Sequence, residues 1–528
     1  MSENIIEMLP ILNEKNPDKK ILYFGNIKNK QFVIESFTYK DIEIKSNIIA
    51  NNLTNLGIKP FDKIILMVPV CEELYLILIA IFKIGATVVI IEPSLDLKQI
   101  DYCCKLTEPK AFIGIRKAHI LRLISTNFRK IPIKIVVKDK KLINEYDFTD
   151  LSYGNDNKFN IFGLNGDEDA LITFTSGSTG VPKGIQRTHN FLKIQMGILH
   201  KILDFEPNDI EMTNLPIFVL NNLGCNVPTV LPFIKKYLLK YIDPKIILTQ
   251  LTQINVNRLT GSPYFIKEII NHCAKNNIKL DNIKKIFTGG GPVETDLINS
   301  IKNISNCKTK IVYGSTEAEP ISLIEEDELL KIKEEKGVCV GKIIDDIKLE
   351  ILQITQNIVS FIDHNKNDLL LKTNQIGEII VKGENVNKSY YKNEKAIKEN
   401  KIFEKNGSFW HRTGDIGYID QNNNLWIVGR KSQAIFYQGN VLNNFYIENK
   451  INKIVGITKS AIIQKDNKTI ILFVEKNRNF TKNKCFDEIS DVLKEFDLKI
   501  DTIKTLNKLP LDKRHNTKVD YGKLLKID

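Results

Sequence analysis

The sequence predicts an α/β protein with a large N-terminal domain and a small C-terminal domain. Short β-branched runs alternate with helical patterns from residue 63 onward, and a glycine-rich loop follows an apolar strand near residue 175. The pattern changes again after residue 430. At 528 residues, the chain is also longer than one hydrophobic core usually serves. We therefore expect two domains, residues 1–430 and residues 431–528.

The first elements predict a largely parallel sheet. Strands are expected at 63–70, 87–92, 111–115 and 133–137, and helices at 72–84 and 97–106. Right-handed crossovers place such helices on both faces of a sheet. The apolar stretch from residue 74 to residue 91 is interrupted by Lys83 and Gly85, so it predicts a helix, a turn and a buried strand rather than a transmembrane segment.

The segment 171–184, Leu-Ile-Thr-Phe-Thr-Ser-Gly-Ser-Thr-Gly-Val-Pro-Lys-Gly, predicts a loop that holds a polyphosphate. Glycines let backbone N–H groups approach an anion, and hydroxyls and one lysine add donors and charge. Pro182 and Gly184 stand where a Walker loop needs glycine and a hydroxyl, so that loop is not predicted. A helix capped by Asn190 is expected to follow. The candidate phosphate contacts are Thr175, Ser176, Gly177, Ser178, Thr179, Gly180 and Lys183. The plain alternative is a flexible surface loop rich in glycine and serine.

Composition argues against several classes of protein. The net charge is +12, but the basic residues are mixed with acids along the chain, so no nucleic-acid role is predicted. The eight cysteines show no metal-binding spacing and are expected to be reduced thiols. The N-terminus carries no secretory or transit pattern, so a cytoplasmic location is expected.

The C-terminal region predicts a small α+β domain with a basic tail. Two strands, at 460–464 and 469–474, are separated by a turn-like Lys-Asp-Asn-Lys segment. A domain of about a hundred residues lies within the usual size range.

Three further motifs stand at 313–320 (Tyr-Gly-Ser-Thr-Glu-Ala-Glu-Pro), 411–420 (His-Arg-Thr-Gly-Asp-Ile-Gly-Tyr-Ile-Asp) and 510–518 (Pro-Leu-Asp-Lys-Arg-His-Asn-Thr-Lys). Together with the loop, they resemble the adenylate-forming (AMP-binding) superfamily, in its acyl-CoA synthetase-like form, over nearly the whole chain. The resemblance implies layered parallel sheets and helices, a distorted β-barrel subdomain and a mobile C-terminal cap. It also implies an enzyme that uses ATP and Mg²⁺. In the family reaction, a carboxylate attacks the α-phosphate, and the acyl group then passes to an acceptor.

The resemblance also assigns roles to individual residues. Glu317 would bind Mg²⁺, Thr316 would contact the α-phosphate, and Asp415 would accept both ribose hydroxyls. Lys518 would stabilise the transition state of adenylation. The remaining nucleotide contacts would be Gly289, Gly290, Gly291, Tyr313, Gly314, Ser315 and Arg430. The plain alternatives are a solvated acid for Glu317, a turn-forming residue for Asp415, a basic tail for Lys518 and an interdomain ion pair for Arg430.

Substrate and acceptor are predicted from departures within the motifs. Val219 stands where peptide-synthetase adenylation domains carry an aspartate, and a buried ammonium facing valine would be unpaired. An apolar, fatty carboxylic acid is therefore predicted, with Val219, Leu220 and Tyr264 as pocket residues. The acceptor is expected to be CoA or the phosphopantetheine of an acyl or peptidyl carrier protein, and Gly439 matches the glycine that lines the pantetheine path. Residues 512–516 depart from the usual lysine motif and resemble the β-lactone synthetases of bacterial olefin biosynthesis, so ring closure by a β-hydroxy acid is the alternative. The alternative from another class is a catalytically silent nucleotide-binding scaffold.

Overall fold

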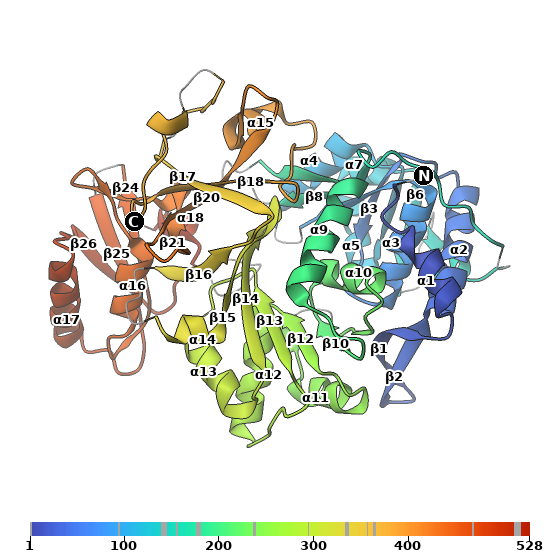
Figure 1. The fold of residues 1–528 in the computed structure, drawn as a ribbon, viewed down its shortest axis with the longest axis horizontal. Helices are drawn as coiled ribbons and strands as arrows, with labels where there is room; N and C mark the ends of the chain where they lie inside the picture. The colour runs from blue at the N-terminus through green and yellow to red at the C-terminus, as the bar shows by residue number, and fades with distance from the viewer. Residues whose placement is uncertain are drawn as a thin grey trace. The chain divides into compact units, whose positions relative to one another are not determined.

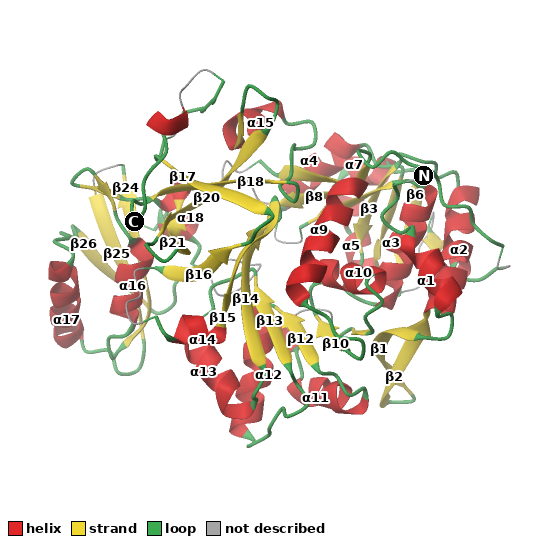
Figure 2. Cartoon of the chain, in the orientation of Figure 1, coloured by secondary structure: helices red, strands yellow, loops and turns green. Residues whose placement is uncertain are grey.

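The computed structural model forms two compact units (Figures 1 and 2). The first comprises Met1–Pro320 with Glu384–Ile397, and the second comprises Ile321–Gly383 with Lys398–Asp528. The predicted domain boundary after residue 430 falls inside the second unit and stays a prediction. The structure describes residues 3–92, 95–138, 145–154, 157–175, 181–235, 239–293, 295–332, 337–355, 357–362, 366–466, 469–511 and 519–527.

The first unit contains the predicted parallel sheet. Its strands lie in the order β7-β6-β5-β3-β4-β8-β9, and only β9 is antiparallel to its neighbour. All four predicted strands are present, because their isoleucine- and valine-rich runs pack well on a pleated surface. The strands are β3 (Lys63–Met67), β4 (Thr87–Ile91), β5 (Ala111–Ile115), β6 (Ile133–Val137), β7 (Tyr146–Asp147), β8 (Asp169–Thr175) and β9 (Lys183–Thr188).

Helices cover both faces of this sheet, as predicted. Successive side chains of a strand point to opposite faces, so Ile64 joins the apolar core formed with α2 and α3, while Ile65 joins the core formed with α4 and α7. Helix α3 ends at Ile84, and the next residue, Gly85, is its C-cap, with a φ of 79° that favours glycine. The helices are α2 (Tyr39–Asn55), α3 (Glu72–Ile84), α4 (Leu97–Thr107), α5 (Arg116–His119), α6 (Leu121–Ile124), α7 (Thr126–Lys130) and α8 (Phe148–Leu151). Within the described ranges, no helix has the length and apolarity needed to cross a membrane.

The element after the glycine-rich loop differs from the prediction. The loop does not join a strand directly to a helix, because β9 follows it and pairs antiparallel with β8. Helix α9 (His189–Leu203) begins only after β9, and Thr188 is its N-cap, accepting a hydrogen bond from the Phe191 N–H. The prediction that Asn190 caps this helix is therefore wrong. Thr188 takes the cap because its backbone is still extended, with φ −75° and ψ 165°.

A second sheet of the first unit carries the triple glycine, at the end of β13, and the start of the motif at 313–320, at the end of β14. Its strands lie in the order β2-β1-β11-β10-β12-β13-β14, parallel except for the β1–β2 pair. Proline near the N-terminus of α10, α11 and α12 helps to start these helices. The strands are β1 (Lys20–Lys28), β2 (Gln31–Thr38), β10 (Glu211–Thr213), β11 (Thr229–Val230), β12 (Arg258–Gly261), β13 (Lys285–Gly289) and β14 (Lys308–Ser315). The helices are α1 (Met8–Lys15), α9, α10 (Pro216–Gly224), η2 (Leu239–Tyr241), α11 (Pro244–Gln253), α12 (Pro263–Lys275) and α13 (Thr295–Ile304).

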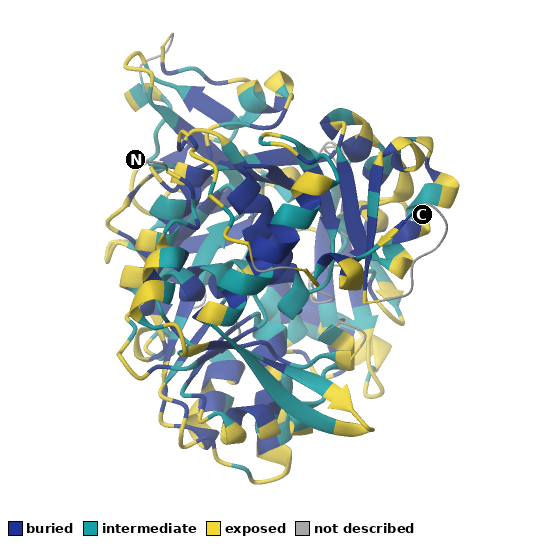
Figure 3. Ribbon diagram, turned by 90° about the vertical axis from the view of Figure 1, so that its right-hand side faces the viewer, coloured by how far each residue is buried: buried dark blue, intermediate teal, exposed yellow. Residues whose placement is uncertain are grey.

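The second unit is built mainly on antiparallel strands. Strands β16, β21, β20, β18 and β17 are neighbours in that order, and β19 pairs with β20. The elements are β15 (Ala318–Glu325), which begins in the first unit, α14 (Glu326–Leu330), β16 (Val338–Ile343), β17 (Ile347–Leu352), η3 (Lys366–Asp368), β18 (Gly377–Gly383), α15 (Glu394–Asn400), which also begins in the first unit, β19 (Lys401–Phe403), β20 (Phe409–Ile419) and β21 (Asn424–Arg430). Strand residues are mostly buried, whereas exposed residues lie mainly on helices and loops (Figure 3).

The part of the second unit that follows residue 430 has a sheet of its own. The predicted strands at 460–464 and 469–474 are confirmed as β24 and β25, which pair antiparallel, and β26 joins β25 in parallel. Apolar clusters lie on both faces of this sheet, with Ile462 in one and Ile463 in the other. The elements are η4 (Lys431–Gln433), β22 (Phe436–Tyr437), β23 (Asn440–Val441), α16 (Asn444–Asn452), β24 (Ile457–Lys465), β25 (Thr469–Lys476), α17 (Lys482–Glu495), β26 (Thr502–Leu506) and α18 (Tyr521–Leu524). The predicted α+β character of this region is confirmed.

Candidate functional site

The glycine-rich loop connects two paired strands. Residues 176–180 lie outside the described residues, which includes Ser176, Gly177, Ser178, Thr179 and Gly180. The two ends of the connection are described: Thr175 of β8 is the register partner of Lys183 of β9. Lys183 is half-buried, and its Nζ lies 5.6 Å from the ring centroid of Tyr390. The fold therefore returns the chain so that the lysine stands beside the start of the loop.

Glu317 lies in the same unit and shares a partner with Lys183. Its Oε1 accepts a hydrogen bond of 3.4 Å from the Tyr390 hydroxyl, and its backbone oxygen accepts one of 2.7 Å from the Asn387 N–H. Tyr390 is 2% exposed. Burial, and then the nearby Glu317 carboxylate, raise the pKa of Tyr390 well above its usual value, so the hydroxyl stays a donor. The structure thus brings a cation, a buried phenol and the predicted metal ligand together.

A buried arginine stands against the same segment. Arg187 of β9 is 8% exposed, and its Nη2 donates a hydrogen bond of 3.3 Å to the backbone oxygen of Thr316. Burial lowers the pKa of Arg187, while the carboxylates of Glu319 and Glu317 act in the opposite direction. An arginine remains charged in such surroundings. Its charge therefore offsets the carboxylates of Glu319 and of Glu317, the candidate metal ligand.

The triple glycine closes strand β13 beside β14. Gly289 pairs with Val312, and a β-carbon at Gly289 would stand 2.3 Å from the Val312 backbone oxygen. Gly290 has a φ of +74°, a backbone conformation that residues with a side chain rarely adopt. At Gly291, by contrast, a β-carbon would make only ordinary van der Waals contacts. Glycine is thus required at the first two positions. Because glycine has no side chain, the backbone there is uncovered, and the resemblance implies that the adenine ring lies against it.

The neighbouring strand β14 presents the other implied nucleotide contacts. Tyr313 is half-buried, and a β-carbon at Gly314 would stand 2.9 Å from the Ala318 backbone oxygen. The hydroxyl oxygens of Ser315 and Thr288 are buried and have no hydrogen-bond partner among the described residues. Buried polar atoms normally find partners. These two unpaired hydroxyls fit a polar ligand at the carboxyl ends of β13 and β14, which is where parallel α/β sheets bind ligands.

Asp415 and Arg430 lie in the second unit and pair with each other. They are register partners on β20 and β21, and Arg430 Nε lies 3.0 Å from Asp415 Oδ1. Gly414, with φ +72°, and the Thr413 hydroxyl, which accepts from the Asp415 N–H at 3.0 Å, shape this turn. The Asp415 carboxylate is thus held by an arginine, with the carboxylate mostly buried and the arginine side chain half-exposed.

The three predicted pocket residues lie in two helices of the first unit. Val219 of α10 is fully buried in the apolar core, and Leu220 packs against that core while partly exposed. Tyr264 lies in the first turn of α12 and is half-buried. Burial, followed by nearby Glu268, raises the pKa of Tyr264.

Lys518 falls in the segment 512–518, outside the described residues. The ends of that segment are described: Leu511 and Val519 pair as an antiparallel bridge. The Asp520 N–H donates a hydrogen bond of 2.8 Å to the Pro510 backbone oxygen. The described residues on either side of the candidate lysine are therefore held next to each other.

Comparison with known proteins supplies the family. Residues 12–391 match the AMP-binding enzyme family. The chain belongs to this family. The predicted superfamily and the predicted AMP-forming ligase are thereby confirmed.

Characterised AMP-binding enzymes resemble the chain over most of its length. It is 26% identical to the olefin β-lactone synthetase of Stenotrophomonas maltophilia, over 87% of this chain and 85% of that protein. It is also 26% identical to the 2-succinylbenzoate–CoA ligase of Oceanobacillus iheyensis, over 97% of both chains. Its fold matches O-succinylbenzoate coenzyme A synthetase from Bacillus subtilis, solved with ATP and magnesium ion, with a TM-score of 0.78, 17% identity and coverage of 98% of both chains. The predicted fold class is confirmed by this likeness.

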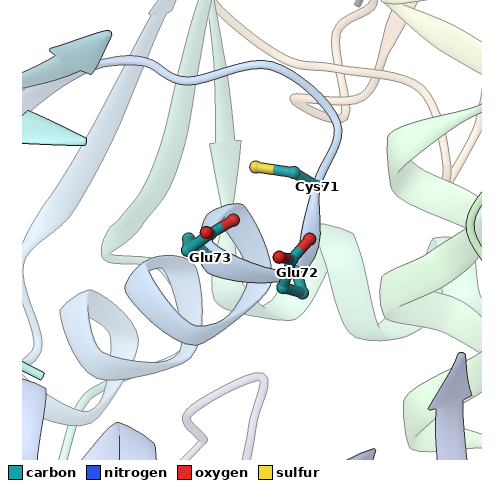
Figure 4. A group of neighbouring side chains, drawn as sticks. All are labelled: Cys71, Glu72 and Glu73. Atoms are coloured by element: carbon teal, nitrogen blue, oxygen red, sulfur yellow. The ribbon is translucent and has the colours of Figure 1, made fainter. Parts of the chain in front are cut away.

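A second group of possible metal ligands stands outside the AMP-binding motifs in the sequence. Cys71, Glu72 and Glu73 lie where α3 begins (Figure 4), with potential ligand atoms within 4.8 Å of one another. The ammonium of Lys138 already lies 3.3 Å from Glu72 Oε1 and 3.0 Å from Glu73 Oε2. Burial, then the Glu73 carboxylate, raise the pKa of the Cys71 thiol well above its usual value. Lysine provides the counter-charge and the thiol stays protonated, so we assign no metal to this group.

Tyr390 and Arg187 were not predicted from the sequence as residues of the candidate site. Tyr390 meets Glu317 although 73 residues separate them, and no motif spacing signals that contact. Arg187 had one usable signal, since it follows Lys183 by four residues in a strand that borders the loop. A predicted strand at that place would have brought Arg187 into consideration.

Proposed function

We propose that the protein activates an apolar carboxylic acid with ATP and Mg²⁺. A carboxylate oxygen of the acid attacks the α-phosphorus of ATP, the bond to the bridging oxygen of the leaving group breaks, and an acyl-adenylate and pyrophosphate form. The observation that supports this most directly is the cluster of Lys183, Tyr390, Glu317 and Arg187 beside the loop that sequence analysis predicted to hold phosphates. Membership of the AMP-binding enzyme family supports the same reaction.

The residues of the cluster suit the charges of this reaction. Both reactants are anions, and two unit charges about 4 Å apart interact by about 4 kcal/mol at an effective dielectric constant near 20. Lys183 would attract the departing pyrophosphate, and Glu317, oriented by Tyr390, would hold Mg²⁺. Bound Mg²⁺ would neutralise charge on the phosphate oxygens. Arg187 would hold the backbone next to Glu317 in place, because it donates a hydrogen bond to the Thr316 backbone oxygen.

Residues of β13, β14 and β20 would bind the nucleoside part of ATP. Gly289 and Gly290 would leave room for adenine, Tyr313 would stack on it, and the unpaired Ser315 hydroxyl would hydrogen-bond to the nucleotide. Asp415 would accept the ribose hydroxyls with the oxygen that does not face Arg430. These assignments predict that Arg430 positions Asp415, rather than forming an interdomain ion pair.

The proposed substrate is a small carboxylic acid with an apolar chain. Val219 is buried among apolar side chains, and a substrate ammonium group there would lose hydration without gaining a partner. Leu220 and Tyr264 would extend this wall. All eight cysteines are free, which supports the proposed cytoplasmic location.

The proposed second step transfers the acyl group to the thiol of CoA or of a carrier-protein phosphopantetheine. The thiolate sulfur attacks the acyl carbon, and AMP leaves. Two features support this step. The relatives that align with almost the whole chain include a CoA ligase. In addition, no atom lies within 4 Å of the place where a β-carbon at Gly439 would stand, so the backbone there is open to a ligand. Lys518, in the proposed C-terminal domain of residues 431–528, would serve only the first step.

A second candidate for the acceptor is the hydroxyl of the acid itself. The Arg-His-Asn sequence before Lys518 and the similarity to olefin β-lactone synthetases favour it. In that step the β-hydroxyl oxygen attacks the acyl carbon, a four-membered lactone closes, and AMP leaves.

One experiment tests both candidates. Fatty acids with and without a β-hydroxyl are incubated with Mg²⁺ and ATP, with and without CoA, and the products are identified by mass spectrometry. Thioester formed only when CoA is present supports the thiol acceptor. Lactone formed from the β-hydroxy acid without any thiol contradicts the thiol acceptor and supports ring closure. Absence of acid-dependent exchange between pyrophosphate and ATP across the panel would contradict the adenylation proposal and favour a silent scaffold.

A further inference from the structure

One stretch of the first unit departs from the mixed charge pattern of the chain. Residues 109–138 contain eight lysines and arginines and no aspartate or glutamate. The chain as a whole has 75 basic and 63 acidic residues. An acid-free stretch of this length therefore concentrates positive charge on one part of the molecule.

The helical part of this stretch turns large aliphatic side chains outward. Helices α5 and α6 are joined at Ile120, which itself has helical φ and ψ of −59° and −29°. Ile120, Leu123 and Ile124 are spaced as i, i+3 and i+4, so they share one side of a helix. Their exposed fractions are 52%, 75% and 57%. Leu121 packs inward against the core of the sheet. This helical segment therefore has two apolar sides, one buried and one exposed.

Basic side chains border these aliphatic residues. We call the set the basic–apolar face; its members are all exposed, and they are Arg116, Lys117, Ile120, Leu123, Ile124, Arg129 and Lys130. Arg129 donates hydrogen bonds to the backbone oxygens of Arg122, at 3.2 Å, and Leu123, at 3.1 Å. These bonds hold its guanidinium next to the most exposed aliphatic residue.

The charge of the face is not neutralised within the described chain. Two other basic residues of the stretch have acidic partners, Arg122 with buried Glu145 and Lys138 with Glu72 and Glu73. Among the described residues, no carboxylate pairs with the four basic members of the basic–apolar face. Burial, and secondarily Arg122, lower the pKa of Lys134, as expected where cations are crowded.

One acid reaches this region from helix α4. Asp101 approaches α7, but its two carboxylate oxygens accept hydrogen bonds from Ser125 and Asn127. It therefore contacts neutral donors rather than the basic residues. The positive potential of the face remains directed to solvent.

We propose that the basic–apolar face docks on an anionic phospholipid surface. The arginines and lysines would contact lipid phosphates, and Ile120, Leu123 and Ile124 would enter the boundary between headgroups and acyl chains. This is binding at a membrane surface, not membrane spanning. A second copy of the chain fits this face poorly, because a symmetric contact would place its cations against each other. The inference rests on the face alone and does not depend on the proposed reaction.

The test measures binding of the full chain to vesicles. Phosphatidylcholine vesicles with and without phosphatidylglycerol are floated with the protein at low and high salt. We expect binding that requires phosphatidylglycerol and weakens with salt. Leu123→Ser should weaken it about tenfold, because burial of one large aliphatic side chain is lost. Lys117→Gln should weaken it about fivefold through the loss of one surface cation.

Val455→Ser is the matched control, because Val455 is 65% exposed and lies in the second unit. It should bind vesicles as the parent does. All variants should keep ATP–pyrophosphate exchange with a water-soluble acid, which separates this proposal from the proposed reaction. Equal binding to pure phosphatidylcholine, or unchanged binding of Leu123→Ser, overturns the proposal. The proposal is also overturned if the parent does not bind vesicles but forms a dimer, or a complex with an acidic carrier protein, that Leu123→Ser loses. Either result assigns the face to a protein partner.

Discussion

Glu448 of helix α16 is a buried carboxyl whose protonation should set the pH dependence of stability in the second unit. The Ile462 N–H donates a hydrogen bond of 2.7 Å to its Oε1, and the Tyr521 hydroxyl lies 3.0 Å from Oε1 and 2.9 Å from Oε2. Burial raises the pKa of Glu448 from 4.5 to about 8, although these two donors act to lower it. The folded protein therefore keeps this proton at pH 7.

The direction of the effect follows from proton binding. Between pH 4.5 and about 8, unfolding releases the Glu448 proton, so the free energy of unfolding falls as pH rises. Its contribution to stability is complete below pH 4.5 and is lost above about pH 8. The loss is about 1.4 kcal/mol for each pH unit, and about 5 kcal/mol over the whole interval. Glu448→Gln removes this titration and keeps a side chain that hydrogen-bonds to Tyr521.

Urea unfolding followed by tryptophan fluorescence measures the effect. The two tryptophans, Trp410 and Trp426, both lie in the second unit, so the signal reports on the unit that contains Glu448. From about pH 5.5 to about pH 8, the stability of Glu448→Gln relative to the parent should rise by about 1.4 kcal/mol for each pH unit. Glu495→Gln makes the same chemical change at an exposed ion pair with Lys450 and should leave the parent's pH dependence unchanged. Equal pH dependence in the parent and Glu448→Gln would refute the reasoning.

Three further changes test the proposed site. Lys518→Ala should lower acyl-adenylate formation by about 10²–10³ and spare thioester formation from preformed acyl-adenylate; equal loss in both assays would remove Lys518 from the first step. Tyr390→Phe takes one hydrogen bond from Glu317 but keeps the ring, so KM for Mg²⁺-ATP should rise about fivefold with little change in kcat, and an unchanged KM would contradict the proposed orientation of Glu317. Gly289→Ala places a β-carbon 2.3 Å from a backbone oxygen and should destabilise the first unit by about 1–3 kcal/mol in thermal unfolding, whereas Gly291→Ala, with nearest contacts of 3.8 Å, should not.

Local patterns predicted much of the first sheet because the relevant forces act over a few residues. The strand at 111–115 and the helix at 72–84 were predicted with their observed bounds, since β-branched runs and helical spacing record burial directly. Strand β9 was missed because its segment, Lys-Gly-Ile-Gln-Arg-Thr, carries two residues of low strand propensity at its start. Pairing with β8, a tertiary contact, makes it a strand.

The candidate site divides in the same way. Lys183, Glu317 and Asp415 could be named from motifs, because the chemistry of phosphate and ribose restricts residue types at short spacing. The ion pair between Asp415 and Arg430 could not be predicted, since it depends on the register of two antiparallel strands. Pairing register is set by the whole buried face of a sheet rather than by the two residues that meet.

The sequence by itself determined the α/β class and the family motifs, because periodicity and short motifs are properties of neighbouring residues. The tertiary structure alone decided that a strand follows the loop and that Tyr390 and Arg187 join Glu317. It alone also turned Ile120, Leu123 and Ile124 outward beside exposed basic residues. The physical reason is that burial depends on which elements pack together, and this packing links segments hundreds of residues apart.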